Sequence, residues 1–597
     1  MVRGCLGTIA TARSLRLMQG WTRRWTDPVD EGSGSLRDRV ARARGLDIET
    51  LGRYCSPTVE SVCVPDALPG ARAVAARLVN SLRADKSIVI YGDYDADGMC
   101  AAAILMHVLR ALRPDAPPRV HIPDRRSDGY GLSVRPLEEL AQQGAQTIVT
   151  VDCGVTGFAP AVRARELGLE LLITDHHALG PGGAMAEAAA IAHPGVGGAL
   201  GEVCGATVAW LVACATVEAW YADKTVPSET SQLLVELLAL AAIGTVADVM
   251  PLIGQSRAVA ALGLSRANRS ALPGVAALKT GGGIRSYERL DAEAVGFRVA
   301  PLLNACGRLG QPADAVELLS LACGGSHAAS TLRDTRRATE IVGAFGKLNE
   351  QRKQLEREIV NAAQRRLDEG FGAKRGAIVL SSREWRREVV GIACARIAER
   401  EGVPVVLLEE HNGVAHGSGR GISGYSLLEG LRSCEHLLER YGGHASAAGV
   451  SVQVAHIPAF REALSSHAAE NAPRLGPPTI TADTIVHPED IDVRAIEAVD
   501  SLGPFGHGFP QPKLLVRQAV IRSAPEVFGA ERDHLRFFAA HAAKPSRELR
   551  CVWWRHGAML QKLRPGSRVH LVGCVQIDRY GGAPKPAFRV IDIADAS

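Results

Sequence analysis

Three aspartates at alternate positions place the strongest constraint on how this chain can fold. Asp93, Asp95 and Asp97 lie in the segment Gly-Asp-Tyr-Asp-Ala-Asp-Gly, residues 92–98, directly after the β-branched run at 87–91. Three carboxylates so close together repel one another at neutral pH unless cations lie among them. A calcium-binding EF-hand loop has a similar spacing, but it requires a preceding helix and a glutamate at its twelfth position, and this sequence has neither. The segment therefore indicates a metal site at the junction of a strand and a helix.

Short apolar runs alternate with helical runs over residues 87–174, which predicts a parallel, doubly wound sheet of the α/β class. Acidic residues follow the later strands too: Asp152 ends the run 147–152, and Asp175 follows the run 169–174. Ligand sites of such sheets lie at the carboxyl ends of the strands, so these side chains are expected to converge. The residues expected at this edge are Asp93, Asp95, Asp97, Asp152, Asp175, His176 and His177, joined by Asp248 at the end of an apolar helix.

The donor types at this predicted site favour Mg²⁺ or Mn²⁺. Carboxylates with one or two imidazoles and no thiolate suit these hard cations better than zinc. The 13 cysteines are scattered from Cys5 to Cys574 without a Cys-x-x-Cys pair, so neither a zinc ribbon nor a disulfide framework is expected. Each acid alone could be an ordinary turn or helix cap. Four acidic segments in register on one predicted sheet favour the metal site instead.

The 597 residues are too many for one core, and the rest of the chain divides into further parts. Residues 332–370 are charged, free of proline and rich in helix formers, which predicts a long helix between domains. A surface helix within one domain is the alternative. A second α/β unit is expected at 376–440, with its last helix at 426–440, and five β-rich runs between 514 and 593 suit a small OB-type barrel. The predicted domains are a helical extension at 1–70, a catalytic domain at 71–325, a connecting helix at 326–370, a second α/β domain at 371–470 and the barrel at 471–597.

Charge and hydropathy give weaker guidance. Lys and Arg number 68 against 64 Asp and Glu, so any groove for nucleic acid has to be local. No apolar run reaches the roughly 20 residues that span a bilayer, and no membrane association is expected. The first 26 residues carry five arginines and no acid, which loosely resembles an organellar transit peptide. A short disordered start is the alternative, and we expect a cytoplasmic protein.

The order and spacing of the acidic segments resemble the DHH phosphoesterase superfamily. Its motifs are matched by residues 92–98, by Val-Asp-Cys-Gly at 151–154, by Asp-His-His at 175–177 and by Thr-Val-Ala-Asp at 245–248. The resemblance implies a centre of two divalent metal ions, Mn²⁺ or Mg²⁺, with the ligands Asp93, Asp95, Asp97, Asp152, His176 and Asp248. It also implies catalytic roles for His177 at the scissile phosphate, for Asp152 between the metals and for Asp175 as the residue that orients its neighbours.

Later segments are similar to the RecJ family within this superfamily. They are residues 122–132, Pro-Leu-Leu-Asn-Ala-Cys-Gly-Arg at 301–308, Gly-Ser-Gly-Arg at 417–420, Gly-Gly-His-Ala-Ser-Ala-Ala-Gly at 442–449 and residues 502–512. Asn304 and Arg308 are expected on a loop, and the glycines beside Arg420 open the backbone to an anion that a guanidinium could clamp. The substrate contacts implied by the resemblance are Arg125, Asn304, Arg308, Ser418, Arg420, Gly442, Gly443 and His444.

Three places depart from the RecJ pattern. The segment 385–392 lacks a histidine and a glycine that the family often carries there. Phe509 stands where an asparagine is common, and Leu302 stands where an arginine is common. The predicted metal ligands are unaffected, so these changes put only peripheral contacts in doubt.

The resemblance implies a DHH catalytic domain, a long connecting helix, a DHHA1 domain and an OB domain. It further implies a metal-dependent exonuclease that degrades single-stranded DNA from its 5′ end to mononucleotides, in DNA repair and recombination. We expect a monomer, with a single-strand-binding protein and a helicase as candidate partners. A small-substrate DHH phosphatase or nanoRNase would lack the barrel and the long helix. A family II pyrophosphatase would lack the DHHA1 motifs, and a scaffold that has lost its metals would not keep the full acidic set.

Overall fold

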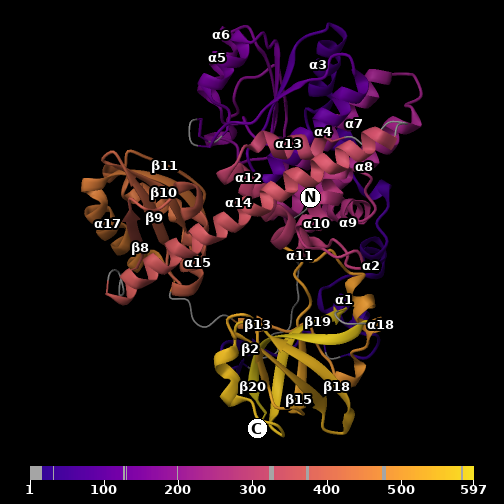
Figure 1. Ribbon diagram of the computed structural model, residues 1–597, viewed down its shortest axis with the longest axis vertical. Coiled ribbons are helices and arrows are strands. Elements are labelled where there is room, and N and C mark those ends of the chain that lie inside the picture. Colours follow the sequence, from indigo (N-terminus) through magenta and orange to yellow (C-terminus); the bar gives the residue numbers. More distant parts are fainter. Residues whose placement is uncertain are drawn as a thin grey trace. The chain divides into compact units, whose positions relative to one another are not determined.

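The computed structural model describes residues 17–30, 32–125, 128–129, 131–197, 200–321, 328–370, 376–473, 479–579 and 583–596 (Figure 1). The chain divides into two compact units. One combines residues 1–57 with 475–597, and the other contains residues 58–474.

A five-stranded parallel sheet organises the first part of the larger unit, as the sequence predicts. Its two outer strands have only three residues each and give no recognisable pattern in the sequence. All neighbouring strands run parallel. The strand order is β4 (Arg119–His121), β3 (Ile88–Tyr91), β5 (Thr147–Val151), β6 (Glu170–Thr174) and β7 (Ala190–Ala192).

Helices cover both faces of this sheet. Ile88 and Ile90 of β3 join the core formed with α3 (Ala71–Arg83), α4 (Ala96–Leu112) and α7 (Gly205–Tyr221). Val89 and Tyr91 point to the opposite face, where they pack with α5 (Val134–Gln142) and α6 (Phe158–Glu166). Because both faces are buried, only the strand ends and their loops are open to a ligand.

Helices α7, α8 (Ser228–Ala247) and α9 (Gly254–Ala267) complete the core behind the sheet. By length and composition α8 could cross a membrane, with a mean hydropathy of 1.6, but more than half of that stretch is buried inside the protein. At Gly263 the helices touch, since a Cβ there would lie 2.1 Å from the carbonyl oxygen of Leu238. Helix α8 is therefore a core helix of this unit. Further helices follow: α10 (Pro273–Gly281), α11 (Ala292–Ala294), the π-helical turn η4 (Val295–Val299), α12 (Ala300–Leu309) and α13 (Pro312–Ser320).

The predicted connecting helix is confirmed as α14 (Ala328–Asp368), which has 41 residues. Its first part packs Val342 and Phe345 into the core of the sheet domain, and its last part packs Ile359 and Ala363 against α15. Between these contacts Glu356 is buried and pairs with Arg352 on α14 and Arg396 on α15, at 3.0 and 2.6 Å. The helix therefore contacts both α/β domains.

The second α/β domain contains a five-stranded sheet, with the strand order β11, β12, β10, β9, β8. The predicted helix at 426–440 is too long, because the α-helix ends at Ser433 and the chain then enters a β-hairpin. The side chain of Ser426 caps the start of this helix. The elements are β8 (Ile378–Ser382), α15 (Arg387–Glu401), β9 (Val405–His411), β10 (Val414–Arg420), α16 (Leu427–Ser433), β11 (Arg440–Gly443), β12 (Ala447–Gln453) and α17 (Ile457–Asn471).

The smaller unit is a closed barrel, which confirms the predicted OB-type architecture. Strand β15 pairs with both β19 and β17, so five strands form a ring. Phe537, Trp553 and Phe588 fill its interior. The strands are β14 (Thr484–Ile485), β15 (Leu514–Ile521), β16 (Glu526–Phe528), β17 (His534–His541), β18 (Lys544–Trp553), β19 (Arg568–Asp578) and β20 (Lys585–Asp595), with α18 (Val493–Asp500) beside them.

The N-terminal segment, predicted as a helical extension at 1–70, differs from that expectation. It contains α1 (Leu36–Ala43) and α2 (Ile48–Cys55), but β1 (Leu17–Gln19) and β2 (Arg24–Thr26) precede them. Strand β2 pairs with β13 (Thr479–Thr481), so residues 17–57 are part of the barrel unit. Three-residue strands that pair across more than 400 residues leave no local signal in a sequence. The arginines Arg3, Arg13 and Arg16 lie outside the described residues, whereas Arg23 and Arg24 lie in this hairpin region.

One carboxylate fastens this segment to the barrel. Asp592 on β20 is fully buried and accepts hydrogen bonds from the backbone N–H groups of Thr22 and Arg23. It also accepts from the Thr22 hydroxyl and from the indole N–H of Trp25, at 2.9 Å each. Four donors converge on this one carboxylate, so its loss would leave buried polar groups without a partner.

We expect Asp592→Ala to lower the local stability of residues 20–26 by about 3 kcal/mol, because buried donors to a charged acceptor become unsatisfied. Hydrogen exchange at the Thr22 and Arg23 amides measures this loss. Asp595→Ala is the matched control, since Asp595 is exposed and accepts a hydrogen bond of 3.2 Å from the indole N–H of Trp21. Equal protection of these amides in the two variants would contradict the prediction.

Candidate metal centre

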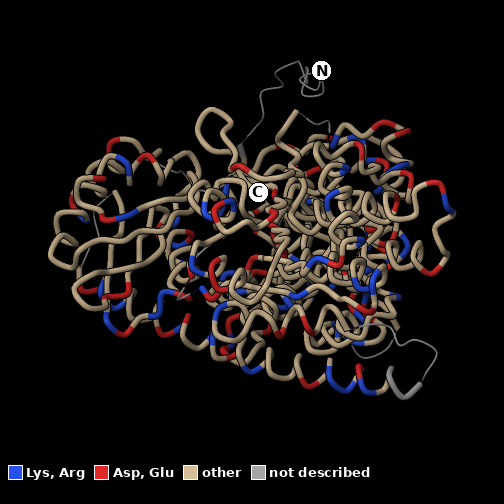
Figure 2. The backbone as a smooth tube through the Cα atoms, turned by 90° about the horizontal axis from the view of Figure 1, so that it is seen from above, with Lys and Arg blue, Asp and Glu red and all other residues tan. Residues whose placement is uncertain are grey.

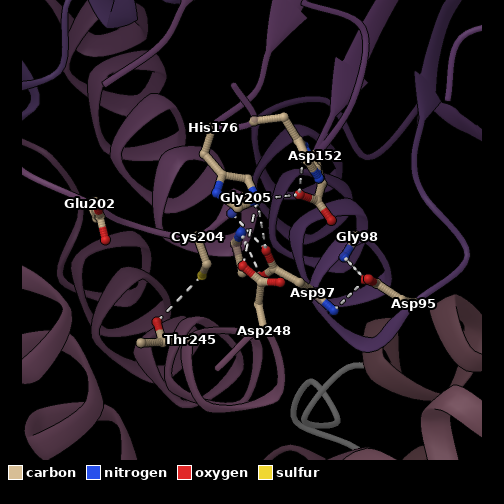
Figure 3. Close-up of polar contacts among 12 residues, drawn as sticks. Asp95, Asp97, Gly98, Asp152, His176, Glu202, Cys204, Gly205, Thr245 and Asp248 are labelled. Atoms are coloured by element: carbon tan, nitrogen blue, oxygen red, sulfur yellow. Dashed lines mark hydrogen bonds and ion pairs between the residues drawn. The ribbon is translucent and has the colours of Figure 1, made fainter. Parts of the chain in front are cut away.

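Acidic side chains from four loops meet at the carboxyl edge of the parallel sheet. In Figure 3, Asp97, Asp152, His176 and Asp248 point toward one another. The imidazole Nε2 of His176 lies 3.0 Å from a carboxylate oxygen of Asp152, 3.7 Å from one of Asp248 and 3.9 Å from one of Asp97. The predicted convergence of these strand ends is therefore observed. Asp93 belongs to the same cluster through Asp152.

The start of α4 fixes two of the aspartates. The helix begins at Ala96, because Asp95 caps it by accepting from the N–H groups of Asp97 and Gly98. Asp97 then lies in the first turn, where it accepts hydrogen bonds from the backbone N–H groups of Gly205 and Ala206. These groups form the N-terminus of α7, whose dipole stabilises a negative charge.

Three glycines allow the loops to approach so closely. A Cβ at Gly98 would lie 2.7 Å from Asp93, and one at Gly205 would lie 2.5 Å from Asp152. At Gly244 on α8 a Cβ would lie 2.3 Å from Asp97. Gly205 is the first residue of α7 and Gly244 lies inside α8. Neither could be identified from the sequence, because the acids that they face come from distant segments.

Asp152 occupies the central position. Its φ of +62° is in the left-handed region, which is unfavourable for a residue with a side chain. Donor atoms of Asp152 lie within 4.8 Å of those of Asp93 and Asp95 on one side, and of His176 and His177 on the other. His176 in turn belongs to a further set with Asp97 and Asp248. Asp152 thus connects two neighbouring sets of donors, each suited to a cation.

Several donor atoms in these sets are buried and, among the described residues, form no hydrogen bond. Buried polar atoms without partners are rare in proteins and require an explanation, such as an ion. Carboxylate and imidazole donors suit a hard divalent cation. The side chains present therefore fit a metal centre. The four atoms are Oδ1 of Asp93, Oδ1 of Asp152, Nε2 of His176 and Oδ2 of Asp248.

The pKa values show how unfavourable this cluster is without cations. Burial, followed by the charge of Asp95, raises the pKa of Asp97 to about 6 and raises that of Asp93 well above its usual range. Burial and the neighbouring Asp97 raise the pKa of Asp152 as well, and that of Asp248 to about 8. Part of the cluster is therefore protonated at neutral pH until a cation replaces the protons.

The two adjacent histidines differ in charge. Burial, together with the neighbouring charge of His177, lowers the pKa of His176 to about 4, so its imidazole is neutral and able to bind a cation. Burial also disfavours the charged form of His177, but a 2.8 Å hydrogen bond to Asp175 and the charges of Asp175, Asp93 and Asp248 together outweigh it and raise the pKa to about 9. Asp175 is buried, yet this bond and the N–H of Val155 hold its pKa at about 2. At neutral pH the pair His177–Asp175 is therefore an imidazolium beside a carboxylate.

Mn²⁺ binding is expected to strengthen as pH rises from 6 to 8. Below pH 8 the carboxyl of Asp248 holds a proton that the cation has to displace, at a cost of about tenfold in affinity per pH unit. Calorimetric titration of the full chain in buffers of different ionisation heat measures both affinity and proton release. Asp248→Asn should flatten the rise between pH 7 and 8. Affinity that does not change from pH 6 to 8 would refute this account.

A cluster of arginines accompanies the metal centre. Burial lowers the pKa of Arg308 to about 10 and also lowers the pKa of Arg420, and the positive charge of Arg125 acts in the same direction on both. The guanidinium of Arg125 lies over the ring of Tyr94, 5.1 Å from its centre. Guanidinium groups whose pKa is lowered by burial and by a neighbouring positive charge are stabilised by an anion, and a phosphate is the anion they match best.

Asn304 and Arg308 lie on helix α12 and not on a loop, which corrects the expectation for this segment. They are four residues apart and so share one face of the helix. Gly307 between them permits this helix to approach the metal loop, because a Cβ there would lie 1.8 Å from the carbonyl oxygen of Tyr94. The Asn304 amide oxygen accepts from the N–H of Ala96, so this side chain holds the start of α4. Arg308 donates to the carbonyl oxygen of Glu388 at 2.8 Å.

The glycine-rich segments of the second domain meet at one end of its sheet. In the register of β10 with β12, Arg420 lies opposite Ala447 and Ser418 opposite Gly449. Gly442 on β11 lies opposite the same Gly449 from the other side. Gly442, Gly443 and His444 are exposed, and Gly443 has a φ of +140° that favours glycine. The structure thus places Ser418, Arg420 and the Gly442–His444 turn together, as the sequence suggests.

The departures from the family pattern occupy structural positions. Leu302 is buried in the sheet domain, and Phe509 is buried in the barrel unit, where it stacks on Phe505 at 5.7 Å. Arg386 precedes the first turn of α15 and, with Trp385, lines a hollow of about 350 Å³ against α14. Neither Leu302 nor Phe509 belongs to the metal centre.

Comparison with known proteins identifies three domains. The model of the DHH family, N-terminal domain matches residues 87–245, that of the DHHA1 domain matches 374–470, and that of the RecJ OB domain matches 482–592. The chain is 33% identical over 559 residues to the single-stranded-DNA-specific exonuclease RecJ of Bacillus subtilis, which covers 92% of this chain and 67% of that protein. It is 33% identical over 532 residues to the protein of that name from Thermus thermophilus, covering 88% and 71%.

Solved structures of proteins with this name are also similar to the chain over most of its length. The crystal structure of RecJ in complex with Mn²⁺ from Thermus thermophilus superposes with a TM-score of 0.74 and 28% identity, covering 96% of this chain and 80% of that one. A crystal structure of exonuclease RecJ bound to manganese matches with a TM-score of 0.56 and 35% identity, covering 69% and 96%. The similarity thus includes the sheet domain, the long helix, the second α/β domain and the barrel.

Proposed function

This chain belongs to the RecJ family of DHH phosphoesterases and is a metal-dependent nuclease, and we propose that it removes 5′-mononucleotides one by one from single-stranded DNA. The observation that carries this proposal is the set of buried, unbonded donor atoms of Asp93, Asp152, His176 and Asp248 beside a cluster of arginines. The relatives act on single-stranded DNA by name, and two of their structures contain Mn²⁺. DNA repair and recombination is the context in which such an activity would serve.

Two divalent cations, Mn²⁺ or Mg²⁺, would be held by Asp93, Asp95, Asp97, Asp152, His176 and Asp248. The three overlapping donor sets, with Asp152 connecting two of them, support two ions over one. Bound cations would supply positive charge for the phosphodiester and lower the pKa of an attacking water. Asp97, anchored by the N-terminus of α7, would fix the position of the centre relative to the sheet.

His177 would act on the scissile phosphate. Its raised pKa makes it an imidazolium at neutral pH, able to donate a hydrogen bond to a phosphate oxygen or a proton to the leaving oxygen. Asp175 would position it, because its carboxylate accepts from the His177 ring and from two backbone N–H groups of the same loop. Asp175 therefore supports the chemistry through His177 and holds the loop in place.

The arginines and the turn Gly442–His444 would recognise the 5′ end of the strand. A terminal phosphate carries more negative charge than an internal diester, so several guanidinium groups select ends over middles. The positive charge of Arg125 lowers the pKa of both Arg308 and Arg420, and Ser418 and Gly442–His444 lie at the same sheet end as Arg420. Asn304 would act indirectly, by holding the start of α4.

Four further expectations stay predictions. They are a monomeric state, a cytoplasmic location, and a single-strand-binding protein and a helicase as partners.

Asp152→Ala is expected to lower hydrolysis of single-stranded DNA by at least about a hundredfold, since a ligand shared by two cations is lost. The measurement is release of labelled 5′-mononucleotide at saturating Mn²⁺, with duplex of the same sequence as a second substrate. Asp115→Ala, at an exposed aspartate, is the matched control. Wild-type protein that requires no divalent cation, or an Asp152→Ala variant with more than about a tenth of the wild-type rate, would refute the proposal.

Arg420→Ala is expected to slow removal of 5′-phosphorylated strands by at least about tenfold while Mn²⁺ affinity stays unchanged. Arg420→Lys should recover only part of the rate, because an ammonium cannot form two parallel hydrogen bonds. Arg432→Ala, at an exposed arginine of the same domain that pairs with Glu429, is the control. The substrates are matched oligonucleotides with a 5′-phosphate, a 5′-hydroxyl or a blocked 3′ end. Digestion stopped by the 3′ block and indifferent to the 5′ end would contradict this polarity.

A further inference from the structure

The histidine that follows the last strand of the parallel sheet contacts the loop that carries His177. His193 lies directly after β7 and is only 2% exposed. Its ring Nε2 lies 2.8 Å from the carbonyl oxygen of His177, and its ring Nδ1 lies 2.9 Å from the backbone nitrogen of Gly195. Both ring nitrogens of this buried side chain are therefore within hydrogen-bond distance of the backbone.

The two contacts fix the tautomer of His193. The backbone N–H of Gly195 can only donate, so Nδ1 accepts and carries no hydrogen. The hydrogen of the neutral ring is then on Nε2, which donates it to the carbonyl oxygen of His177. The neutral ring thus satisfies both of its polar atoms, as a buried side chain requires.

The backbone around His193 is itself held by neighbouring segments. Its N–H donates to the carbonyl oxygen of Pro69 at 3.1 Å. The carbonyl oxygen of Ala192, one residue earlier, accepts from the N–H of Asp175 at 3.2 Å. The end of β7 is therefore a fixed support beside the loop 175–177.

The loop 175–177 is held from two sides. The carboxylate of Asp175 accepts from the backbone N–H groups of His176 and His177 and from the His177 ring. His193 binds the same loop at the carbonyl oxygen of His177. The His177 ring, which is 34% exposed, is thus fixed through one ring nitrogen and through both polar groups of its own backbone.

Short contacts of this kind matter because charge of one sign is not concentrated along the chain. In the described parts of the tube in Figure 2, Lys and Arg are interspersed with Asp and Glu. The direction of the His177 ring therefore depends on its hydrogen bonds and not on a long-range field. A catalytic group that is misplaced by about 1 Å can lose on the order of a hundredfold in rate.

We propose that His193 is a positioning residue for the hydrolysis, and that it sets the direction of the His177 ring through its hydrogen bond to the His177 carbonyl oxygen. The proposal rests on the proposed function, in which His177 acts on the scissile phosphate. His193 acts through His177 and not through the metal ligands, since its ring bond is to the His177 backbone.

The test compares two substitutions of equal length in the full chain. His193→Gln places an amide N–H near the position of Nε2, whereas His193→Met fills the same space without a donor. The rate of the chemical step is measured in single turnovers of 5′-phosphorylated oligothymidylate at saturating Mn²⁺. It should stay within about threefold of wild type for His193→Gln and fall at least about tenfold for His193→Met. Equal rates for the two variants would overturn the proposal.

His107→Gln and His107→Met are the matched controls. His107 on α4 is 4% exposed, and its ring Nε2 lies 2.9 Å from the carbonyl oxygen of Leu319. It lies ten residues after Asp97 on the same helix, about 15 Å along the axis. Both pairs of variants should lose similar thermal stability, but only the pair at His193 should differ in the rate of the chemical step.

A double-mutant cycle identifies the route of the effect. In the His177→Ala background the backbone carbonyl remains and the ring is gone, so His193→Met should then change the rate less than about twofold. A tenfold loss in both backgrounds would indicate a general structural effect and would overturn the proposal. Mn²⁺ affinity, measured by calorimetry, should not differ between the two variants at His193. A loss of rate that more Mn²⁺ restores would mean that His193 acts through the metal ligands, and would also overturn it.

The tautomer is measured without a loss-of-activity variant, which keeps the proposal testable if His193→Met does not fold. In the nitrogen spectrum of protein labelled at its 18 histidines, His193→Gln identifies the signal of His193 by removing it. That signal should show a neutral ring with its hydrogen on Nε2. A charged ring, or a hydrogen on Nδ1, would overturn the proposal.

Failure of this proposal and failure of the proposed function are distinguishable. Mn²⁺-dependent digestion with equal rates for His193→Gln and His193→Met would remove the positioning role and leave the exonuclease. Wild-type protein without Mn²⁺-dependent digestion would refute the proposed function, and with it the role of His193 in hydrolysis.

Discussion

The mutual repulsion of buried carboxylates at one sheet edge is the constraint on which the larger unit depends. Asp93, Asp97 and Asp152 are almost fully buried, and Asp248 lies beside them. Removing charges from water is costly, and placing like charges together adds to that cost, so the protein alone can keep them only by protonation. The N-terminus of α7 offsets part of this cost, because its backbone N–H groups donate hydrogen bonds to Asp97. The part of the cost that remains favours the binding of divalent cations at this site.

The arginines of the site, like its acids, carry charges that the surrounding protein does not neutralise. Arg308 donates to the carbonyl oxygen of Glu388, and Arg420 donates to that of Gly419. A neutral acceptor orients a guanidinium without neutralising it, so the charge of each arginine stays available for an anion. The acids are thus placed to bind cations, and under the proposed function the arginines would bind phosphate, so that a phosphodiester carrying divalent cations would satisfy both at once.

The sequence is sufficient to predict those site residues that lie directly after a strand or at the end of a helix. The acids at 93, 95, 97, 152 and 248 follow strands or end a helix, and the rule for parallel sheets brings them together. The sequence suggests a loop for Asn304 because its partner, the N–H of Ala96, lies more than 200 residues away. Gly205 and Gly244 give no signal for the same reason, and neither does the pairing of β2 with β13. Close approaches between distant segments leave no periodic pattern, and these are what the sequence alone could not predict.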